Sequence, residues 1–340
     1  MGNNLYVHFP FCRRKCAYCA LPSRPGSSSE EREEYAASIA DRIRRLAPRL
    51  DGLDTVYFGG GTPALCDLSP VLDALAPLLL PEAEFTVELH PHDVSEDLLS
   101  SLRDGGVNRI SMGVQSLEDD VLVSMGRGYS VAEAEKAFGL VRGKFDNAGI
   151  DLIVGYPHER GDWAERLPRL ADWGLAHCSV YALQNERGLA DVADDETAMS
   201  RIAVASACLG GIGLVRYEIS NYAVPGRECR HNLSVWRGED YFGLGRWAHG
   251  RLGLLRTVDY LGPTEESETV TQAFDWAERR VFRLRLREGL DLAKLGDVPP
   301  HWAEHMDRCV RERLLLRDGS VYRLTARGTE VCDSILAELV

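Results

Sequence analysis

The sequence predicts an α/β fold: a partial, open TIM-type barrel of about six βα units, followed by a small C-terminal winged-helix-like α+β module. Apolar strand-like runs alternate with helical patterns through the first two-thirds of the chain. Six such strands can be counted, fewer than the eight of a closed barrel. A hairpin pattern follows helical segments near the C-terminus.

The strand-like runs are short and end in polar or glycine-rich segments. They cover residues 5–9, 55–58, 85–89, 109–114, 150–154 and 179–183. Between the first two, Tyr35, Ile39, Ile43 and Leu46 recur at three- and four-residue spacing, which is typical of an amphipathic helix. In barrels of this type the chemistry lies at the carboxyl ends of the strands, so functional residues are expected in the loops that follow.

Changes in pattern divide the chain into three segments. Residues 1–214 contain the barrel, and residues 215–264 are rich in glycine and aromatic residues and are expected to be irregular. Residues 265–340 are expected to form the helical, winged-helix-like module, with a hairpin turn at 317–320.

Composition limits the classes of partner and compartment. The chain carries 39 Lys and Arg against 52 Asp and Glu, a net charge of −13, which disfavours nucleic acid as a partner. No apolar run is long enough to cross a membrane, and the N-terminus lacks the features of a signal peptide. A cytoplasmic location is therefore expected.

Three of the nine cysteines lie within eight residues, directly after the first predicted strand. Cys12, Cys16 and Cys19 have the spacing C-x3-C-x2-C. Three thiolates can hold three irons of a 4Fe–4S cluster and leave the fourth open to the amino and carboxylate groups of S-adenosylmethionine. The basic run 13–15 should favour the thiolate form. The alternatives are a zinc site short of one ligand, since no His or Cys closely follows Cys19, or a dithiol pair.

The opening Tyr6-Val-His-Phe-Pro-Phe-Cys12, together with the cysteine motif, resembles radical-SAM enzymes related to oxygen-independent coproporphyrinogen III dehydrogenase. The best fit is their HemW-type branch, the heme chaperones. The resemblance runs nearly the full length of the chain. The further blocks, in the family's order, are Phe58-Gly-Gly-Gly-Thr-Pro63, Gly113-Val-Gln-Ser116, Met125-Gly-Arg127, Asp151-Leu-Ile-Val-Gly-Tyr-Pro157, Tyr217-Glu-Ile-Ser-Asn221, Glu228-Cys-Arg-His-Asn232, Gly243-Leu-Gly245, Ala248-His249 and Leu324-Thr-Ala-Arg-Gly328.

The resemblance implies a set of residues that bind S-adenosylmethionine. They are Tyr6, Tyr18, Gly60, Gly61, Thr62, Glu88, Gln115, Arg127 and Asp151. A glycine turn lets backbone groups approach the cofactor, carboxylates accept hydrogen bonds from ribose hydroxyls or an ammonium, and an Arg fork can bind the cofactor carboxylate. From the residues alone, the glycine turn is as readily a mere tight turn, and each of the polar residues is more often a structural group.

The stretch His231-Asn232-Leu-Ser-Val-Trp236 resembles the HNxxYW signature of the heme-chaperone branch, with Val235 in place of Tyr. The resemblance implies that His231 is an axial ligand of heme iron. Cys229 is a second possible ligand, and a hydrogen-bonded structural histidine is the alternative. His8, His90, His92 and His249 are expected to be structural or to support the site, and Tyr129 replaces the His expected after Gly-Arg.

Three functions fit these features. The first is binding and delivery of heme; the second is coproporphyrinogen III dehydrogenation; the third is a radical-SAM C-methyl transfer. The dehydrogenase resembles a longer chain with an N-terminal arm and a further Cys where Leu21 stands, so the chaperone is preferred. Whether S-adenosylmethionine is cleaved, and hence whether the protein is an enzyme, stays open. The expected partners are a heme or porphyrin ligand, a heme-acceptor protein and an electron donor.

A basic run near the start of the last segment stands apart from these motifs. Arg283, Arg285 and Arg287 alternate with apolar residues, which resembles one face of a strand, although residues 276–280 before them look helical. We interpret the run as a solvated charged face. Residues 290–340 carry nine acidic and seven basic side chains, so the winged-helix-like module lacks a basic footprint for DNA.

Overall fold

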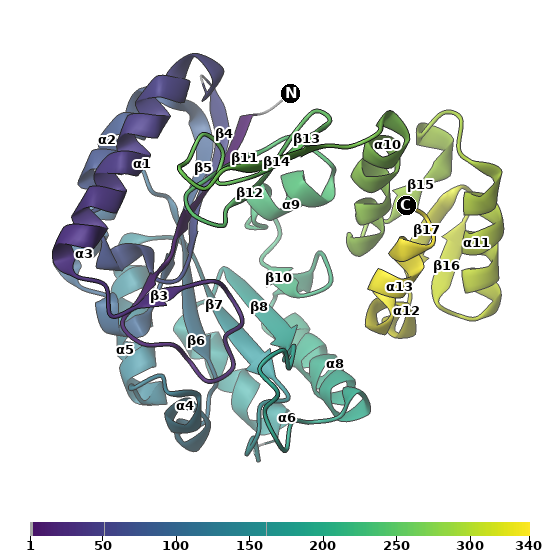
Figure 1. Ribbon diagram of the computed structural model, residues 1–340. Helices are drawn as coiled ribbons and strands as arrows, with labels where there is room; N and C mark the ends of the chain where they lie inside the picture. The colour runs from purple at the N-terminus through teal and green to yellow at the C-terminus, as the bar shows by residue number, and fades with distance from the viewer. Residues whose placement is uncertain (1–2, 51, 161) are drawn as a thin grey trace.

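The computed structural model describes residues 3–50, 52–160 and 162–340 of the chain. Six parallel strands form the centre of its main sheet (Figure 1). They are β1 (Asn3–Phe9), β4 (Leu53–Gly60), β5 (Leu79–Leu89), β6 (Arg109–Gln115), β7 (Asn147–Val154) and β8 (His177–Ala182). Each of the six predicted runs overlaps one of these strands, and the strands follow one another across the sheet in chain order.

Three short strands extend the sheet to nine. β11 (Phe242–Leu244) pairs in parallel with β1 at one edge. At the other edge β10 (Asn221–Ala223) pairs antiparallel with β8, and β9 (Val215–Arg216) pairs antiparallel with β10. Within the described residues β11 and β9 do not pair with each other, so the barrel is open. The predicted fold class is confirmed, but segment 215–264 is not irregular: it supplies both edges of the sheet.

Helices cover the outer face of the curved sheet (Figure 1). They are α1 (Ser29–Leu50), α2 (Ser69–Leu75), α3 (Glu96–Asp104), α4 (Asp119–Met125), α5 (Val131–Lys144), α6 (Trp163–Arg166), α7 (Leu170–Trp173) and α8 (Asp195–Gly211). Local sequence sets their starts: Ser130 and Glu133 form a capping box at α5, and the Ser95 side chain accepts a hydrogen bond from Leu98 N at α3.

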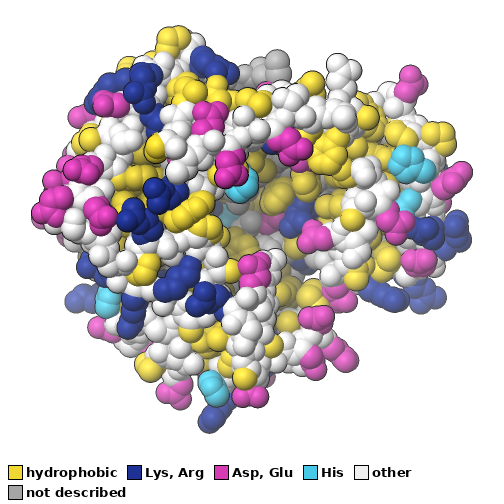
Figure 2. Space-filling model, viewed as in Figure 1, with side chains coloured by type: hydrophobic (Ala, Val, Ile, Leu, Met, Phe, Trp, Pro, Cys, Tyr) yellow, Lys and Arg dark blue, Asp and Glu magenta, His cyan; other side chains and the backbone are white. Residues whose placement is uncertain are grey.

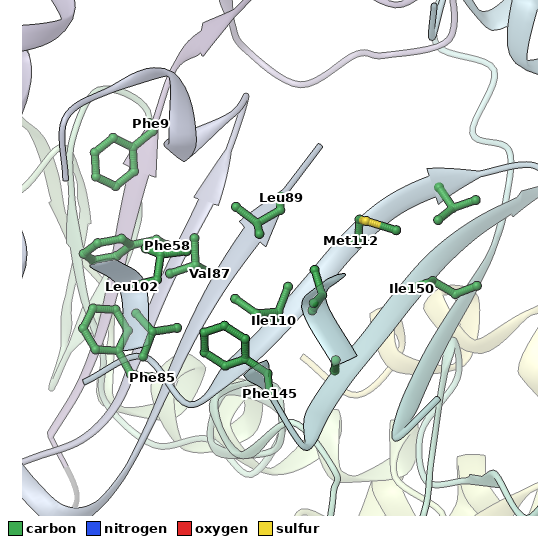
Figure 3. Close-up of a cluster of buried hydrophobic side chains, with 14 of the residues drawn as sticks. Phe9, Phe58, Phe85, Val87, Leu89, Leu102, Ile110, Met112, Phe145 and Ile150 are labelled. Carbon is green, nitrogen blue, oxygen red and sulfur yellow. The ribbon is translucent and has the colours of Figure 1, made fainter. Parts of the chain in front are cut away.

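The central strands are apolar on their outer face and largely polar on their inner face. The outward side chains pack against the helices in one continuous core, seen in Figure 3 for Phe9, Phe58, Phe85, Val87, Leu89, Ile110, Met112 and Ile150. Neighbouring residues of a strand point to opposite faces. The residues between them therefore point into the barrel: Asn4, Tyr6, His8, Thr55, Tyr57, Glu84, Thr86, Glu88, Arg109, Ser111, Asp151, His177 and Ser179. Polar side chains are therefore concentrated on this inner face.

Residues 249–269 form a flap over the barrel interior. The flap is a three-stranded antiparallel sheet of β12 (His249–Leu252), β13 (Leu255–Val258) and β14 (Glu266–Thr269). The helix α9 (Arg230–Trp236) is separate from the flap and precedes β11. A buried ion pair joins this flap to α1, with 2.5 Å between Arg42 Nη1 and Asp259 Oδ1.

The C-terminal module lies at the right of Figure 1. It has a hydrophobic core of its own, which includes Leu284, Trp302 and Met306. Its elements are α10 (Gln272–Val281), the 3-10 turn η5 (Phe282–Arg285), β15 (Leu290–Asp291), α11 (Pro300–Arg311), β16 (Leu315–Asp318), β17 (Val321–Leu324), α12 (Ala326–Glu330) and α13 (Cys332–Ala337). The strands form a sheet in the order β15-β17-β16. The hairpin is present, but β16 runs to Asp318, so the turn is shorter than the predicted 317–320.

Candidate functional site

The cysteine motif lies at the carboxyl end of β1, against the glycine turn that ends β4. Cys12, Cys16 and Cys19 are free thiols and half-buried. A Cβ atom on Gly61 would lie 2.9 Å from Cys12 Sγ and 2.4 Å from the carbonyl oxygen of Phe11. Only glycine fits at this position. The loop that carries the thiols is thus packed directly on the predicted cofactor turn.

Among the described residues, no three His, Cys, Asp or Glu side chains converge as the ligands of a single metal ion do. A cubane does not require such convergence, because each thiolate binds a different iron. Three features fit a 4Fe–4S cluster: the half-buried thiols, the close packing that requires glycine at position 61, and the nearby cation of Arg127. Arg127 Nη1 lies 3.5 Å from Cys16 Sγ.

The basic run 13–15 does not keep the Cys12 thiol in its thiolate form. Arg13 pairs with Asp93, and Lys15 Nζ donates a hydrogen bond to Ser23 Oγ at 3.0 Å. Burial raises the pKa of the Cys12 thiol by more than Lys15 lowers it. Without iron this thiol is therefore protonated, and cluster assembly must displace its proton.

Arg127 is buried beside the cysteine loop and is oriented by tyrosines. Its Nε donates to Tyr129 Oη at 2.9 Å, Nη2 donates to the Gly113 carbonyl at 2.5 Å, and Nη1 lies 3.4 Å from Tyr18 Oη. Tyr129, at the position where a His was expected, anchors this arrangement through its hydroxyl at the end of β6. Gln115 ends β6 with a left-handed backbone, at φ 73°. The structure therefore brings Arg127, Tyr18 and Gln115 to one strand end.

Two carboxylates stand on the inner face below the glycine turn. Tyr57 Oη donates to Glu88 Oε1 at 2.8 Å, and the Gly60 N–H donates to Glu88 Oε2 at 3.2 Å. Ser111 Oγ donates to Asp151 at 3.1 Å. Burial, reinforced by the Asp151 charge, raises the pKa of Glu88 to about 7, and burial also raises the pKa of Asp151.

If Glu88 binds S-adenosylmethionine, as the sequence predicts, this shift should make the binding pH-dependent. A hydroxyl or ammonium donor binds ionised Glu88 better than the neutral acid, so the affinity should rise as the pH increases towards about 7 and level off above it. In Glu88→Gln the rise should disappear, and binding at alkaline pH should weaken by roughly 1.5–3 kcal/mol. In the absence of cofactor, the ionisation of Glu88 affects the stability of the fold in the opposite direction. The free energy of unfolding falls as the pH rises from the pKa of this carboxyl in the unfolded chain through about 7. Calorimetric titration across this pH range checks the first effect, and a pH-independent wild-type affinity would contradict it.

A cavity of about 1000 Å³ lies between the barrel interior, α9 and the flap. A hollow with hydrophobic side chains around it opens near the centre of the face seen in Figure 2. Aromatic and basic residues from separate elements line the cavity, among them Tyr181, His231, Trp236, Arg246, Trp247 and His249. Tyr6, Tyr57 and Glu88 also line it. The cavity therefore adjoins the predicted S-adenosylmethionine site.

His231 projects from α9 and is held in one tautomer. Its Nδ1 lies 2.7 Å from Thr55 Oγ1, whose hydroxyl donates to Asn4 Oδ1 at 2.8 Å. The Asn4 amide nitrogen donates to the Asp240 carbonyl, which fixes the orientation of the amide. Thr55 must therefore accept from Nδ1–H, and Nε2 carries the lone pair. Burial, with a smaller effect of Arg109, lowers the pKa of His231 to about 3, so the ring is neutral.

Glu84 positions this histidine and was missed at the sequence level. Its Oε2 accepts from Arg230 N at 2.9 Å and its Oε1 from His231 N at 3.1 Å, so a buried carboxylate holds the first turn of α9. Cys229 Sγ points to Glu84 at 3.6 Å, and burial raises the pKa of this thiol to about 12. Cys229 does not line the cavity, so it is not placed to act as a second heme ligand.

The other histidines occupy different settings. Both ring nitrogens of His8 have partners, the Tyr6 hydroxyl at 2.9 Å and the Pro22 carbonyl at 3.3 Å. His90 and His92 pack edge-on against Tyr129. His249 lies exposed at the cavity.

Comparison with known proteins agrees with this geometry. The model of the radical SAM superfamily matches residues 6–171. The heme chaperone HemW of Mycobacterium tuberculosis is 31% identical to this chain, over 99% of this chain and 94% of that protein. This chain belongs to the HemW family. HemW of Bacillus subtilis is 32% identical over 76% of this chain and 73% of that protein.

Among solved structures, coproporphyrinogen III oxidase (HemN) from Escherichia coli superimposes with a TM-score of 0.84, at 20% identity, over 99% of this chain and 90% of that one. This likeness shows that this chain has the fold of HemN. Membership of the radical SAM superfamily implies a 4Fe–4S cluster and S-adenosylmethionine. Across the described helices, none combines the length and the hydrophobicity needed to span a bilayer.

Proposed function

We propose that this protein is a heme chaperone, which binds heme in the cavity beside its radical-SAM site and passes it to an acceptor protein. The observation that carries the proposal is the state of His231: a neutral imidazole, with its lone pair on Nε2, at the wall of a cavity of about 1000 Å³. A neutral imidazole nitrogen whose partner nitrogen is hydrogen-bonded is a well-prepared iron ligand. The HemW relatives support the same function.

The cavity walls suit a flat, amphipathic macrocycle. Trp236 and Trp247 supply aromatic surface, and Arg246 supplies a cation for a propionate. Trp236 is held from behind by Phe282, with ring centroids 5.8 Å apart, and by Arg285, 4.5 Å from the ring centroid. Val235, in place of the signature Tyr, also lines the cavity and leaves its wall apolar there.

The cluster and S-adenosylmethionine occupy the adjoining site in this proposal. Cys12, Cys16 and Cys19 bind three irons, and a reduced cluster can supply an electron to the sulfonium. The cofactor is held by the residues of the glycine turn and of the strand ends: Tyr6, Tyr18, Gly60, Gly61, Thr62, Glu88, Gln115, Arg127 and Asp151.

We assign a different role to each of the three segments of the chain. Residues 1–214 hold the cluster and S-adenosylmethionine, residues 215–264 supply the heme ligand, and residues 265–340 support the cavity wall through Phe282 and Arg285. The partners are a heme-acceptor protein and an electron donor. We place this activity in the cytoplasm, where the nine free cysteines stay reduced.

Two parallel anaerobic assays test the proposal. Cluster-loaded protein is supplied with hemin in the first assay, and with coproporphyrinogen III, S-adenosylmethionine and a reductant in the second. We expect hemin binding with transfer to an apo heme protein, and no loss of coproporphyrinogen III. Accumulation of protoporphyrinogen IX would instead assign the protein to the dehydrogenases.

A further inference from the structure

A second hollow, of about 800 Å³, lies where α9 ends and the C-terminal module begins. Six cationic side chains line it, against the two carboxylates of Glu288 and Asp291. The cations are Arg237, Arg279, Arg280, Arg283, Lys294 and Arg323. In a chain with a net charge of −13, this is a marked local excess of positive charge.

Some of these cations are neutralised by carboxylates. Arg279 binds Asp240 at 2.5 Å and Asp275 at 2.8 Å. Arg237 pairs with Glu288 at 3.2 Å. Two further pairs are looser: Lys294 with Asp291 at 3.5 Å and Arg323 with Asp318 at 3.8 Å.

Arg280 and Arg283 differ, because each donates only to a backbone carbonyl. Arg280 Nη1 donates to Trp276 O at 2.8 Å, and Arg283 Nη2 donates to Arg237 O at 3.2 Å. Within the described part of the chain, neither guanidinium has a carboxylate partner. The Arg280 guanidinium lies 4.4 Å from the centroid of the Trp276 ring, which fixes its plane. Burial and the nearby Arg283 charge lower the pKa of Arg280, as expected for a cation whose charge is poorly compensated.

The structure changes the interpretation of the basic run at 283–287. Arg283 lies in the turn η5 and points to the hollow, whereas Arg285 stacks on Trp236 and pairs with Asp333 at 3.0 Å. The run is therefore not one solvated face. Arg283 instead joins Arg280, from α10, in a concave site.

We propose that this hollow binds a small anion that carries two or more phosphate groups. Arginine forks suit phosphate oxygens, and two unpaired guanidiniums beside Lys294 and Arg323 match several negative charges better than one. The concave shape and the strongly negative net charge favour a small ligand over an acidic protein surface or a nucleic acid. The hollow shares no lining residue with the proposed heme cavity. The two are nevertheless neighbours, because Trp236 lines the heme cavity and the next residue, Arg237, lines the hollow.

The test is a titration of the full-length protein with inorganic triphosphate and, separately, with ATP, at physiological ionic strength. Binding is followed by calorimetry and by tryptophan fluorescence, to which Trp276, lying against Arg280, contributes. The double variant Arg280→Gln/Arg283→Gln should bind at least about tenfold more weakly. The matched control is Arg45→Gln/Arg311→Gln, which removes the same charge from exposed positions on α1 and α11 and should bind as the wild type does.

Each outcome decides the proposal. Equal affinity for triphosphate and ATP would support recognition of the phosphate chain alone, and tighter ATP binding would support recognition of a nucleotide. Absence of binding to both anions, equal weakening in the two double variants, or binding only of an acidic peptide such as oligoglutamate would overturn it. Thermal unfolding and hemin titration of each variant show whether the fold and the separate heme cavity are intact.

Discussion

Replacing Cys16 by alanine should abolish the 4Fe–4S cluster while the protein stays folded. The three loop thiols are half-buried, and Cys16 alone of them contacts Arg127, whose cation can offset cluster charge. With two thiolates left, a cubane loses one of the three protein ligands that retain it. Anaerobically reconstituted wild type should hold about four irons and four sulfides per chain, and the variant close to none. Cys12→Ala and Cys19→Ala should behave in the same way.

The control is an isolated cysteine with similar exposure. Cys208 is half-buried on α8, so Cys208→Ala should keep the full cluster. The same is expected for the remaining isolated cysteines of the two cores: Cys66, Cys178, Cys309 and Cys332. A full complement of iron in Cys16→Ala would show that the ligand assignment is wrong.

Local pattern sufficed to predict the central sheet. Each of its six parallel strands has outward apolar residues that contact one continuous core, so the hydrophobic signal was strong. The edge strands β9, β10 and β11 are only two or three residues long, too short for any periodicity. Their place is set by pairing with strands that lie far away in the chain.

The environment of His231 could not be predicted for the same reason. Asn4, Thr55 and Glu84 come from three different strands, and each makes an ordinary polar contact that no short motif marks. Alternation of polar and apolar residues in 84–89 and 109–115 was the available signal, because fully buried parallel strands are normally apolar throughout. It indicates a barrel with a polar interior but does not reveal which polar groups meet.

The basic run at 13–15 failed as a predictor of the Cys12 pKa because sequence neighbours need not face the thiol. Burial of Cys12 depends on the whole loop and outweighs Lys15, while Arg13 turns to Asp93. The cation that does reach a thiol, Arg127, lies 111 residues beyond Cys16.

Replacing His231 by alanine should remove most of the heme affinity. The imidazole is neutral, its tautomer is fixed by Thr55, and Nε2 is available to iron. Loss of partners that only orient a metal ligand typically costs 10–100-fold, so loss of the ligand itself should cost on the order of 100-fold or more. Trp236→Ala should weaken binding less, because it removes a wall of the cavity and not the iron ligand.

Hemin titration of the cluster-loaded protein, followed by the Soret band and by electron paramagnetic resonance of the ferric heme, tests the central claim most directly. The wild type should bind one hemin with an imidazole-ligated spectrum, and His231→Ala should lose both the affinity and that spectrum. His249→Ala, which removes an exposed imidazole from the same cavity, should retain both. Unchanged affinity and an unchanged Soret band in His231→Ala would contradict the account.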